Sequence, residues 1–242
     1  MNNSQAGEII RMVQDKEPAE GLDMLSGLLP GKIIFTTSFG MEDQVITDMI
    51  FTGNMDIEVV TLDTGRLFRE TYKVFGKTIG KYGRNIRCYY PDTAAVEKLV
   101  SEKGPFSFYE SVENRKECCH IRKVEPLNRA LMGMECWITG IRATQSTNRD
   151  RLQIIEKDPD RGILKYNPLL HWDQQDVEDY IKAHNVPYNI LHDKGYASIG
   201  CEPCTRALKP GEDFRDGRWW WESNSNKECG LHENNRQKAT QK

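Results

Sequence analysis

The chain has 242 residues, enough for one large domain with a sizeable core. Its 33 basic residues are balanced by 36 acidic ones, which argues against a general nucleic-acid or membrane binder and makes any anion site local. No run of about 18 apolar residues occurs, and the first residues lack a basic region followed by an apolar one. We therefore expect a cytoplasmic protein without a signal peptide or a membrane span.

The first half of the sequence predicts strands that alternate with helices. Apolar residues at helical spacing predict helical structure over the first 30 residues, which end at Pro30. Runs rich in β-branched and aromatic residues predict four strands, within residues 31–40, 56–63, 85–91 and 136–141, and the segments between them have helical spacing. This alternation predicts an α/β fold, with a parallel twisted sheet, helices on both faces and ligand chemistry at the strands' C-terminal ends.

The second half of the sequence is less regular. Residues 152–158 and 163–169 predict an edge hairpin around the turn at 158–162, and a helix is predicted to begin at Asp173. From Lys209 onward Pro, Gly, Asp, Asn and Arg dominate. We therefore expect a single α/β nucleotide-binding domain over residues 1–210, followed by a mobile C-terminal tail over residues 211–242.

Two of the predicted strands end in loops that suit a nucleotide. TTSFGMED (36–43) offers Ser38, Gly40 and backbone N–H groups that can cradle an anion, although an ordinary helix start with a Ser cap explains it equally well. LDTG (62–65) offers Asp63 and Thr64, and the Asp63 carboxylate can accept a hydrogen bond from a ribose hydroxyl. The alternative for this second loop is a simple helix cap.

Four of the seven cysteines form a more specific pattern. Cys118 and Cys119 are adjacent, and Cys201 and Cys204 form a C-x-x-C pair. Four thiolates suit a tetrahedral zinc or a 4Fe-4S cluster, and adjacent cysteines favour the cluster because neighbouring side chains can reach different irons. The alternatives are two buried cysteine pairs, or a redox C-x-x-C that leaves Cys118 and Cys119 unexplained.

Basic residues gather near these cysteines in the sequence. If the fold brings their loops together, they form a pocket for a compact anion such as phosphate or sulfate, because Arg can donate two parallel hydrogen bonds to its oxygens. The basic residues are Arg122, Lys123, Arg142, Arg149, Arg215 and Arg218.

The last cysteine of the sequence, Cys229, stands in a polar tail where side chains seldom find a core.

Together these residues resemble the assimilatory adenylyl-sulfate (APS) and phosphoadenylyl-sulfate (PAPS) reductases, over a span from about residue 32 to residue 232. The resemblance implies an adenine-nucleotide α-hydrolase-like parallel sheet. It rests on the motifs TTSFG (36–40), LDTG (62–65), ETY (70–72), CCHIRK (118–123), WITG (137–140) with Arg142 and Gln145-Ser146, GCEPC (200–204) and KECGLH (227–232).

The resemblance also implies a cofactor, a substrate and contacts to it. The subgroup that carries both cysteine pairs holds a 4Fe-4S cluster and generally prefers APS, which implies a cluster on Cys118, Cys119, Cys201 and Cys204 and APS as the substrate. Nucleotide contacts are implied near Ser38 and Gly40. The implied anion contacts are Lys123, Arg149, Arg215 and Arg218.

Cys229 matches the nucleophile of this family. The resemblance implies that its thiolate attacks the sulfur of APS, expels AMP and carries a thiosulfonate, from which thioredoxin or glutaredoxin releases sulfite. The alternatives are a PAPS-preferring or dual-specificity reductase, an ATP pyrophosphatase-type nucleotidyl transferase of the same fold, and a zinc-binding adaptor with a docking patch at residues 219–221. The sequence leaves the oligomeric state open, a homo-oligomer included.

Overall fold

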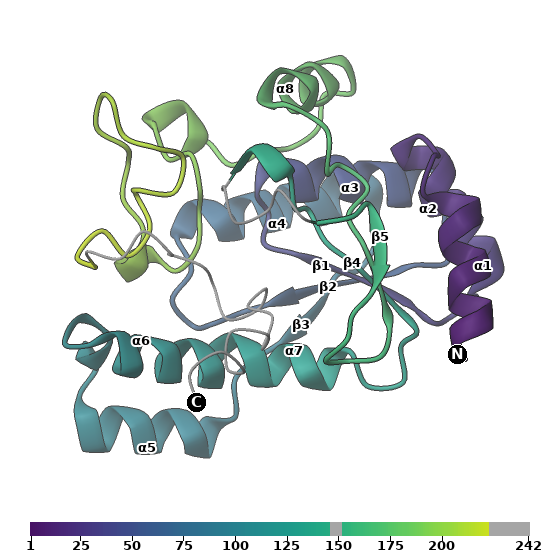
Figure 1. Ribbon diagram of the computed structural model, residues 1–242. Coiled ribbons are helices and arrows are strands. Elements are labelled where there is room, and N and C mark those ends of the chain that lie inside the picture. The colour runs from purple at the N-terminus through teal and green to yellow at the C-terminus, as the bar shows by residue number, and fades with distance from the viewer. Residues whose placement is uncertain (146–151, 223–242) are drawn as a thin grey trace.

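A six-stranded sheet with the order β3-β2-β1-β4-β6-β5 forms the centre of the computed structural model, which describes residues 1–145 and 152–222 (Figure 1). Neighbouring strands run parallel except β5, which pairs antiparallel with β6. The predicted parallel sheet and the edge hairpin are both confirmed. The strands are β1 (Ile33–Thr37), β2 (Glu58–Leu62), β3 (Arg87–Tyr89), β4 (Cys136–Ile138), β5 (Ile155–Lys157) and β6 (Leu164–Tyr166).

Helices cover both faces of this sheet, as predicted (Figure 1). Helices α1 to α4 and α8 contribute to the larger core on one face, and α7 packs on the other. The helices are α1 (Asn3–Val13), α2 (Pro18–Leu28), α3 (Met41–Thr52), α4 (Arg69–Tyr82), α5 (Thr93–Lys103), α6 (Val112–Cys119), α7 (Glu125–Ala130) and α8 (Gln174–Ala183).

Strand β1 shows why its run of apolar residues is buried on both sides. Successive side chains of a strand point to opposite faces of the sheet. Ile33 and Phe35 belong to the core under α1 to α4, and Ile34 belongs to the core under α7 together with Trp137. All four side chains are at most 1% exposed, so β1 sits at the centre of a sheet that is covered on both faces.

Helix α6 continues into α7 through a π turn, η2 (His120–Val124). The Ser111 side chain caps the start of α6 by accepting from the backbone N–H of Asn114. Single π turns inside α-helices are frequent at functional sites. Here the π turn directly follows Cys118 and Cys119 and contains Lys123.

The chain after α8 forms a lobe beside the sheet, drawn in green and yellow in Figure 1. It contains short 3₁₀ turns, and the first residues of the predicted tail belong to it: Arg218, Trp219 and Glu222 are buried. No helix in the described ranges is long and apolar enough to cross a membrane. Within residues 1–145 and 152–222, the 3₁₀ turns are η1 (Ser107–Tyr109), η3 (Ala143–Gln145), η5 (His192–Lys194) and η6 (Glu202–Cys204).

Candidate active site

A cavity of about 200 Å³ lies at the C-terminal ends of β1, β2 and β4. The strand order changes direction between β1 and β4, and ligands of open α/β sheets bind at such a switch point. A larger cavity of about 940 Å³ adjoins it and shares His192 and Phe214 with it. Among the residues that line the smaller cavity are Ser38, Gly40, Glu42, Asp43, Lys123, Gly140, His192, Gly200, Arg215 and Arg218.

The first predicted loop lies in the wall of this cavity. Both the backbone N–H and the hydroxyl of Ser38 donate to the Asp43 carboxylate at 2.6 Å. Gly40 is the N-cap of α3 and makes no side-chain cap hydrogen bond, so the Ser-capped alternative is not what the structure shows. Phe39 between them has a φ of 61°, a backbone conformation that is uncommon outside glycine and recurs at functional sites.

Asp43 is a buried carboxylate in this wall. Burial raises its pKa to about 6, although the hydrogen bonds from Ser38 lower it and the neighbouring Glu42 raises it further. A Cβ atom on Gly140 would clash with the Asp43 carboxylate, so the strand end at Gly140 approaches closely because it has no side chain. Ser38, Asp43 and Gly140 therefore fix the ends of β1 and β4 against each other.

The second predicted loop binds protein groups instead of lining the cavity. Asp63 accepts from the backbone N–H of Gly65 at 2.8 Å and from the Tyr72 hydroxyl at 2.9 Å. Thr64 is fully buried, and its hydroxyl lies 3.3 Å from the sulfur of Cys201. Among the described residues, Asp63 and Thr64 are not part of the cavity wall. The loop therefore connects β2 to the cysteine loop.

The four predicted ligand cysteines converge on a third, very small cavity of about 20 Å³, the cysteine cavity. Cys118 and Cys119 end α6, whereas Cys201 directly precedes η6 and Cys204 is its last residue. The Glu202 N–H donates to the carbonyl of Arg66, the residue after the LDTG loop, at 2.8 Å. Among residues 1–145 and 152–222, no three Cys, His, Asp or Glu side chains are close enough to hold a metal ion. A cavity this size holds about one water, so a larger group requires the side chains to move apart.

Cations surround these thiols and change their acidity. Burial raises the pKa of Cys201, but Lys123, the hydrogen bond with Thr64, and the guanidinium groups of Arg218 and Arg122 together bring it below its usual value. Burial raises the pKa of Cys204 to about 12, with a further contribution from Cys201. Burial also raises the pKa of Cys118, so of these three thiols only Cys201 has a lowered pKa. The site therefore offers three buried thiols and the half-buried Cys119 around one space, a donor set that suits a group with thiolate ligands.

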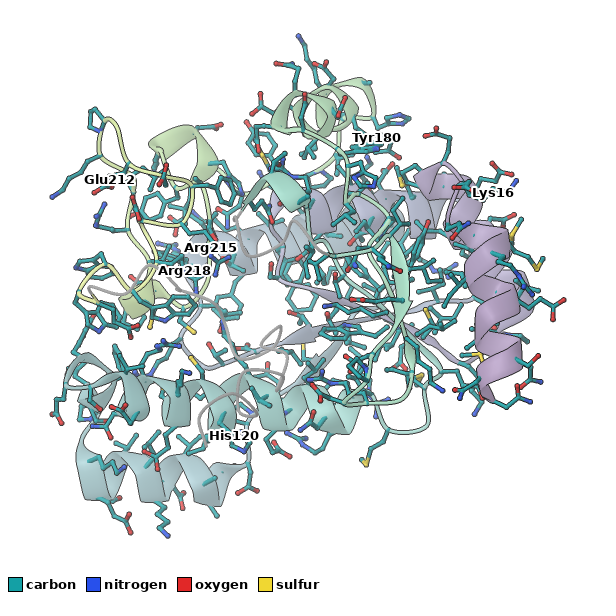
Figure 2. The ribbon with its side chains drawn as sticks, in the orientation of Figure 1. Lys16, His120, Tyr180, Glu212, Arg215 and Arg218 are labelled. Carbon is teal, nitrogen blue, oxygen red and sulfur yellow. The ribbon has the colours of Figure 1, made fainter. Side chains whose placement is uncertain are left out.

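Lys123 lines both the cavity of about 200 Å³ and the cysteine cavity, so it connects the two. Arg215 and Arg218 also line the cavity of about 200 Å³, and Figure 2 shows both in the C-terminal lobe. Arg218 donates to the Cys204 carbonyl at 3.3 Å and lies over the Trp219 ring at 4.7 Å. A Cβ on Gly200 would clash with the Arg218 guanidinium. Three of the six basic residues named from the sequence, from two distant segments, therefore line one cavity beside the cysteines, whereas Arg122 lines the cysteine cavity and Arg142 the cavity of about 940 Å³.

Sequence reasoning missed two parts of this wall. His192 lines both larger cavities, and its buried Nε2 has no hydrogen-bond partner among the described residues. Burial lowers its pKa, against smaller opposing contributions led by Glu42. Glu42 accepts from Arg142 at 2.8 Å and from Gln145 at 2.7 Å. The ED pair after the first loop was the available signal for Glu42, whereas nothing near His192 in the sequence marks it.

Two predicted residues, Arg149 and Cys229, lie outside the described residues. The remaining cysteines behave as apolar residues. Cys136 is fully buried in β4, and burial raises its pKa to about 12, whereas Cys88 in β3 is half-buried.

Residues 32–207 match the phosphoadenosine phosphosulfate reductase domain. The chain belongs to this family. Its relatives include the adenosine 5'-phosphosulfate reductase of Sinorhizobium fredii (strain USDA 257), 52% identical over 87% of this chain and 84% of the relative. The enzyme of the same name from Neisseria meningitidis serogroup B is 50% identical over 82% of this chain and 81% of its own length.

Solved structures agree with this family and with the fold. The phosphoadenylyl-sulfate reductase of Candida auris, solved with phosphate, superposes with a TM-score of 0.71 at 31% identity and covers 85% of this chain and 98% of its own. The FMN adenylyltransferase of Candida glabrata, solved with FAD and pyrophosphate, has a TM-score of 0.54 at 17% identity, covers 96% and 77% of the two chains, and shows the fold alone. The predicted nucleotide-binding α/β fold is therefore confirmed.

Proposed function

We propose that the chain is a cytoplasmic oxidoreductase that reduces adenosine 5'-phosphosulfate to sulfite and AMP in sulfate assimilation. The observation that carries this proposal is the cavity at the switch point of the sheet, where Lys123, Arg215 and Arg218 face the same space beside four cysteines. Phosphate and sulfate groups of the substrate need such cations in a partly buried pocket. The relatives that match most of the chain are named for this reaction.

The substrate has a place for each of its parts in this cavity. The phosphosulfate lies among the three cations, and the nucleoside extends toward Ser38, Gly40 and Gly140 at the ends of β1 and β4. Arg149 supplies a further anion contact. The cations stabilise the negative charge that builds on the phosphate of the leaving AMP.

Cys229 is the nucleophile of the proposed reaction. Its thiolate attacks the sulfate sulfur, the bond from sulfur to the bridging oxygen breaks, and AMP leaves with that electron pair, so that Cys229 carries a thiosulfonate. One thiol of reduced thioredoxin or glutaredoxin then attacks the Cys229 sulfur and displaces sulfite. The second thiol resolves the mixed disulfide, so the partner is oxidised and Cys229 returns as a thiol.

We further propose that Cys118, Cys119, Cys201 and Cys204 hold a 4Fe-4S cluster. The donor set fits, because the three buried thiols, the half-buried Cys119 and the surrounding cations face one space. When bound, the cluster supplies a fixed charge and ties α6 to the loop at η6. Lys123, which lines both the cysteine cavity and the substrate cavity, would then orient the sulfate oxygens.

The test is sulfite release by anaerobically purified protein with reduced thioredoxin and either APS or PAPS. Faster release from APS is expected, with about four irons per chain. Faster release from PAPS would remove the link between the cysteine pairs and substrate choice but keep Cys229 as the nucleophile. Release of pyrophosphate from ATP without sulfite from either substrate would indicate a nucleotidyl transferase, and zinc in place of iron would contradict the cluster.

A further inference from the structure

Three aromatic side chains form an exposed apolar surface next to the cysteines. Phe106, Tyr109 and Trp220 are 62%, 39% and 38% exposed, and we call them the aromatic surface. Phe106 directly precedes η1, Tyr109 is its last residue, and Trp220 belongs to the last described residues, 111 positions after Tyr109. An exposed patch assembled from distant segments is a common sign of an interaction site.

Contacts with the residues underneath hold the aromatic surface in place. The Tyr109 ring packs edge-on against Trp221, with ring centroids 4.4 Å apart, and its hydroxyl donates to the Pro203 carbonyl at 2.6 Å. Phe108 lies 4.4 Å from Tyr109 and belongs to the same apolar core as Cys118, Cys201 and Cys204. The aromatic surface is therefore the outer layer of the core that encloses the cysteines, and it is preorganised for contact.

The aromatic surface is also close in sequence to the proposed nucleophile, Cys229. Trp220 precedes Cys229 by nine residues, and an extended chain spans at most about 3.4 Å per residue, so the Cys229 sulfur lies within about 30 Å of the surface. The buried Glu222, bonded to Arg115, fixes the start of this span. A protein bound to the aromatic surface is therefore within reach of a group carried on Cys229.

We propose that the aromatic surface is the docking site for the dithiol protein that releases sulfite from Cys229. This inference rests on the proposed function, which requires a protein thiol to attack the Cys229 sulfur. A single sulfur–sulfur contact at Cys229 gives the partner little surface to bind, so we expect a second contact on the described part of the chain. Apolar surface around the partner's dithiol matches three aromatic side chains, and a contact of this small size permits release after each turnover.

Two serine variants of the aromatic surface test this proposal. Phe106→Ser and Trp220→Ser, alone and combined, remove exposed rings that have no place in the substrate cavity or the cysteine site. The matched control is Met132→Ser, which removes an apolar side chain that is 70% exposed, two residues after the end of α7. Three rates are compared: thiosulfonate formation on Cys229 with APS and no reductant, sulfite release against thioredoxin concentration, and sulfite release with dithiothreitol.

The double variant is expected to form the thiosulfonate and to react with dithiothreitol at the wild-type rates. Its KM for thioredoxin is expected to rise at least about tenfold, which corresponds to about 1.4 kcal/mol, because aromatic side chains are enriched among the contacts that dominate protein interfaces. The control is expected to match the wild type in all three rates. A raised KM for thioredoxin, with the thiosulfonate and dithiothreitol rates unchanged, would separate lost docking from damage to the active site.

Other results would overturn the proposal. A thioredoxin dependence equal to that of Met132→Ser would show that the partner binds elsewhere. Slower thiosulfonate formation in the double variant would indicate that the chain's own tail uses the surface, and loss of a dimer in sedimentation would assign it to a second copy. If the wild type forms no thiosulfonate with APS, the proposed function itself fails, which is a different outcome from failed docking.

Discussion

The Arg115 guanidinium and the Glu222 carboxylate form a buried ion pair across 107 residues of sequence. Nε donates to Oε1 at 2.8 Å and Nη2 donates to Oε2 at 3.0 Å, and the two side chains are 3% and 4% exposed. Arg115 lies on α6 one turn before Cys118, and its guanidinium also lies over the Trp219 ring at 4.7 Å. The pair therefore joins the helix of the first cysteine pair to the last described residues before Cys229.

Breaking this pair is expected to destabilise the protein strongly. Glu222→Gln leaves the Arg115 charge buried without its carboxylate, which typically costs about 3–5 kcal/mol. Lys103→Met is the control, because Lys103 and Glu117 form a pair that is 40% and 41% exposed and worth at most about 1 kcal/mol. The free energies of unfolding come from urea titration. Equal losses in the two variants would contradict the buried geometry of the pair.

Lys123 is expected to act on the substrate and not on the fold. Lys123→Ala removes a cation that lines both the substrate cavity and the cysteine cavity, and loss of one such electrostatic contact typically costs about 100- to 1,000-fold in rate. The measurement is single-turnover formation of the Cys229 thiosulfonate, with iron content determined on the same sample. Lys98→Ala, on the exposed side of α5, is the control. An unchanged rate would remove Lys123 from the sulfate site.

Much of the fold follows from local sequence, because each signal needs only a few neighbouring residues. The β-branched runs predicted β1 and β2, and the turn at residues 158–162 predicted the edge hairpin of β5 and β6. The convergence of Lys123, Arg215 and Arg218 was predicted only with the help of the family resemblance. Spacing alone shows no contact between residues about 90 positions apart.

The rest of the site depends on contacts that local sequence does not encode. Asp63 and Thr64 follow a strand, as cavity residues do, but their partners are Tyr72 and Cys201, and the second of these is 137 positions away from Thr64. His192 stands in an irregular segment, and its place in the cavity wall depends on how the lobe folds over the sheet. Polar residues at strand ends are therefore easy to predict, but their partners are not.

Asp43 is expected to make stability depend on pH. Its pKa is about 6 in the folded protein against a usual value of 3.8, so the folded state binds the proton more tightly. The resulting stabilisation is fully present below pH 3.8 and is lost as the pH rises through 6, and a shift of about two units corresponds to about 3 kcal/mol. Asp43→Asn cannot lose a proton, so it removes this dependence.

The measurement is urea unfolding of the wild type and of Asp43→Asn from pH 4 to pH 7.5. Between these limits the variant is expected to gain stability relative to the wild type as the pH rises. Glu8→Gln, an exposed carboxylate on α1, serves as the control and is expected to follow the wild-type profile. A constant difference between wild type and Asp43→Asn across this range would show that the carboxylate is not held as the structure describes.

Gly200 is expected to control the position of Arg218. A Cβ at Gly200 would clash with the Arg218 guanidinium, which packs against this backbone between the Cys204 carbonyl and the Trp219 ring. Gly200→Ala therefore displaces the guanidinium from the cavity that Arg218 lines. Because Arg218 contacts the anionic part of the substrate in the proposed function, the KM for APS is expected to rise about tenfold or more, the equivalent of one lost charged contact.

Gly76→Ala is the matched control for this substitution. Nothing lies within 4 Å of a Cβ at Gly76 in the middle of α4, so alanine there meets no clash and is expected to stabilise the helix by about 0.5–1 kcal/mol. Its KM for APS is expected to equal that of the wild type. If the KM for Gly200→Ala also stays at the wild-type value, either Arg218 adapts and keeps its contact with the anion, or Arg218 never contacts the anion. Arg218→Ala separates these two explanations. Its KM for APS rises only if Arg218 contacts the anion in the wild type.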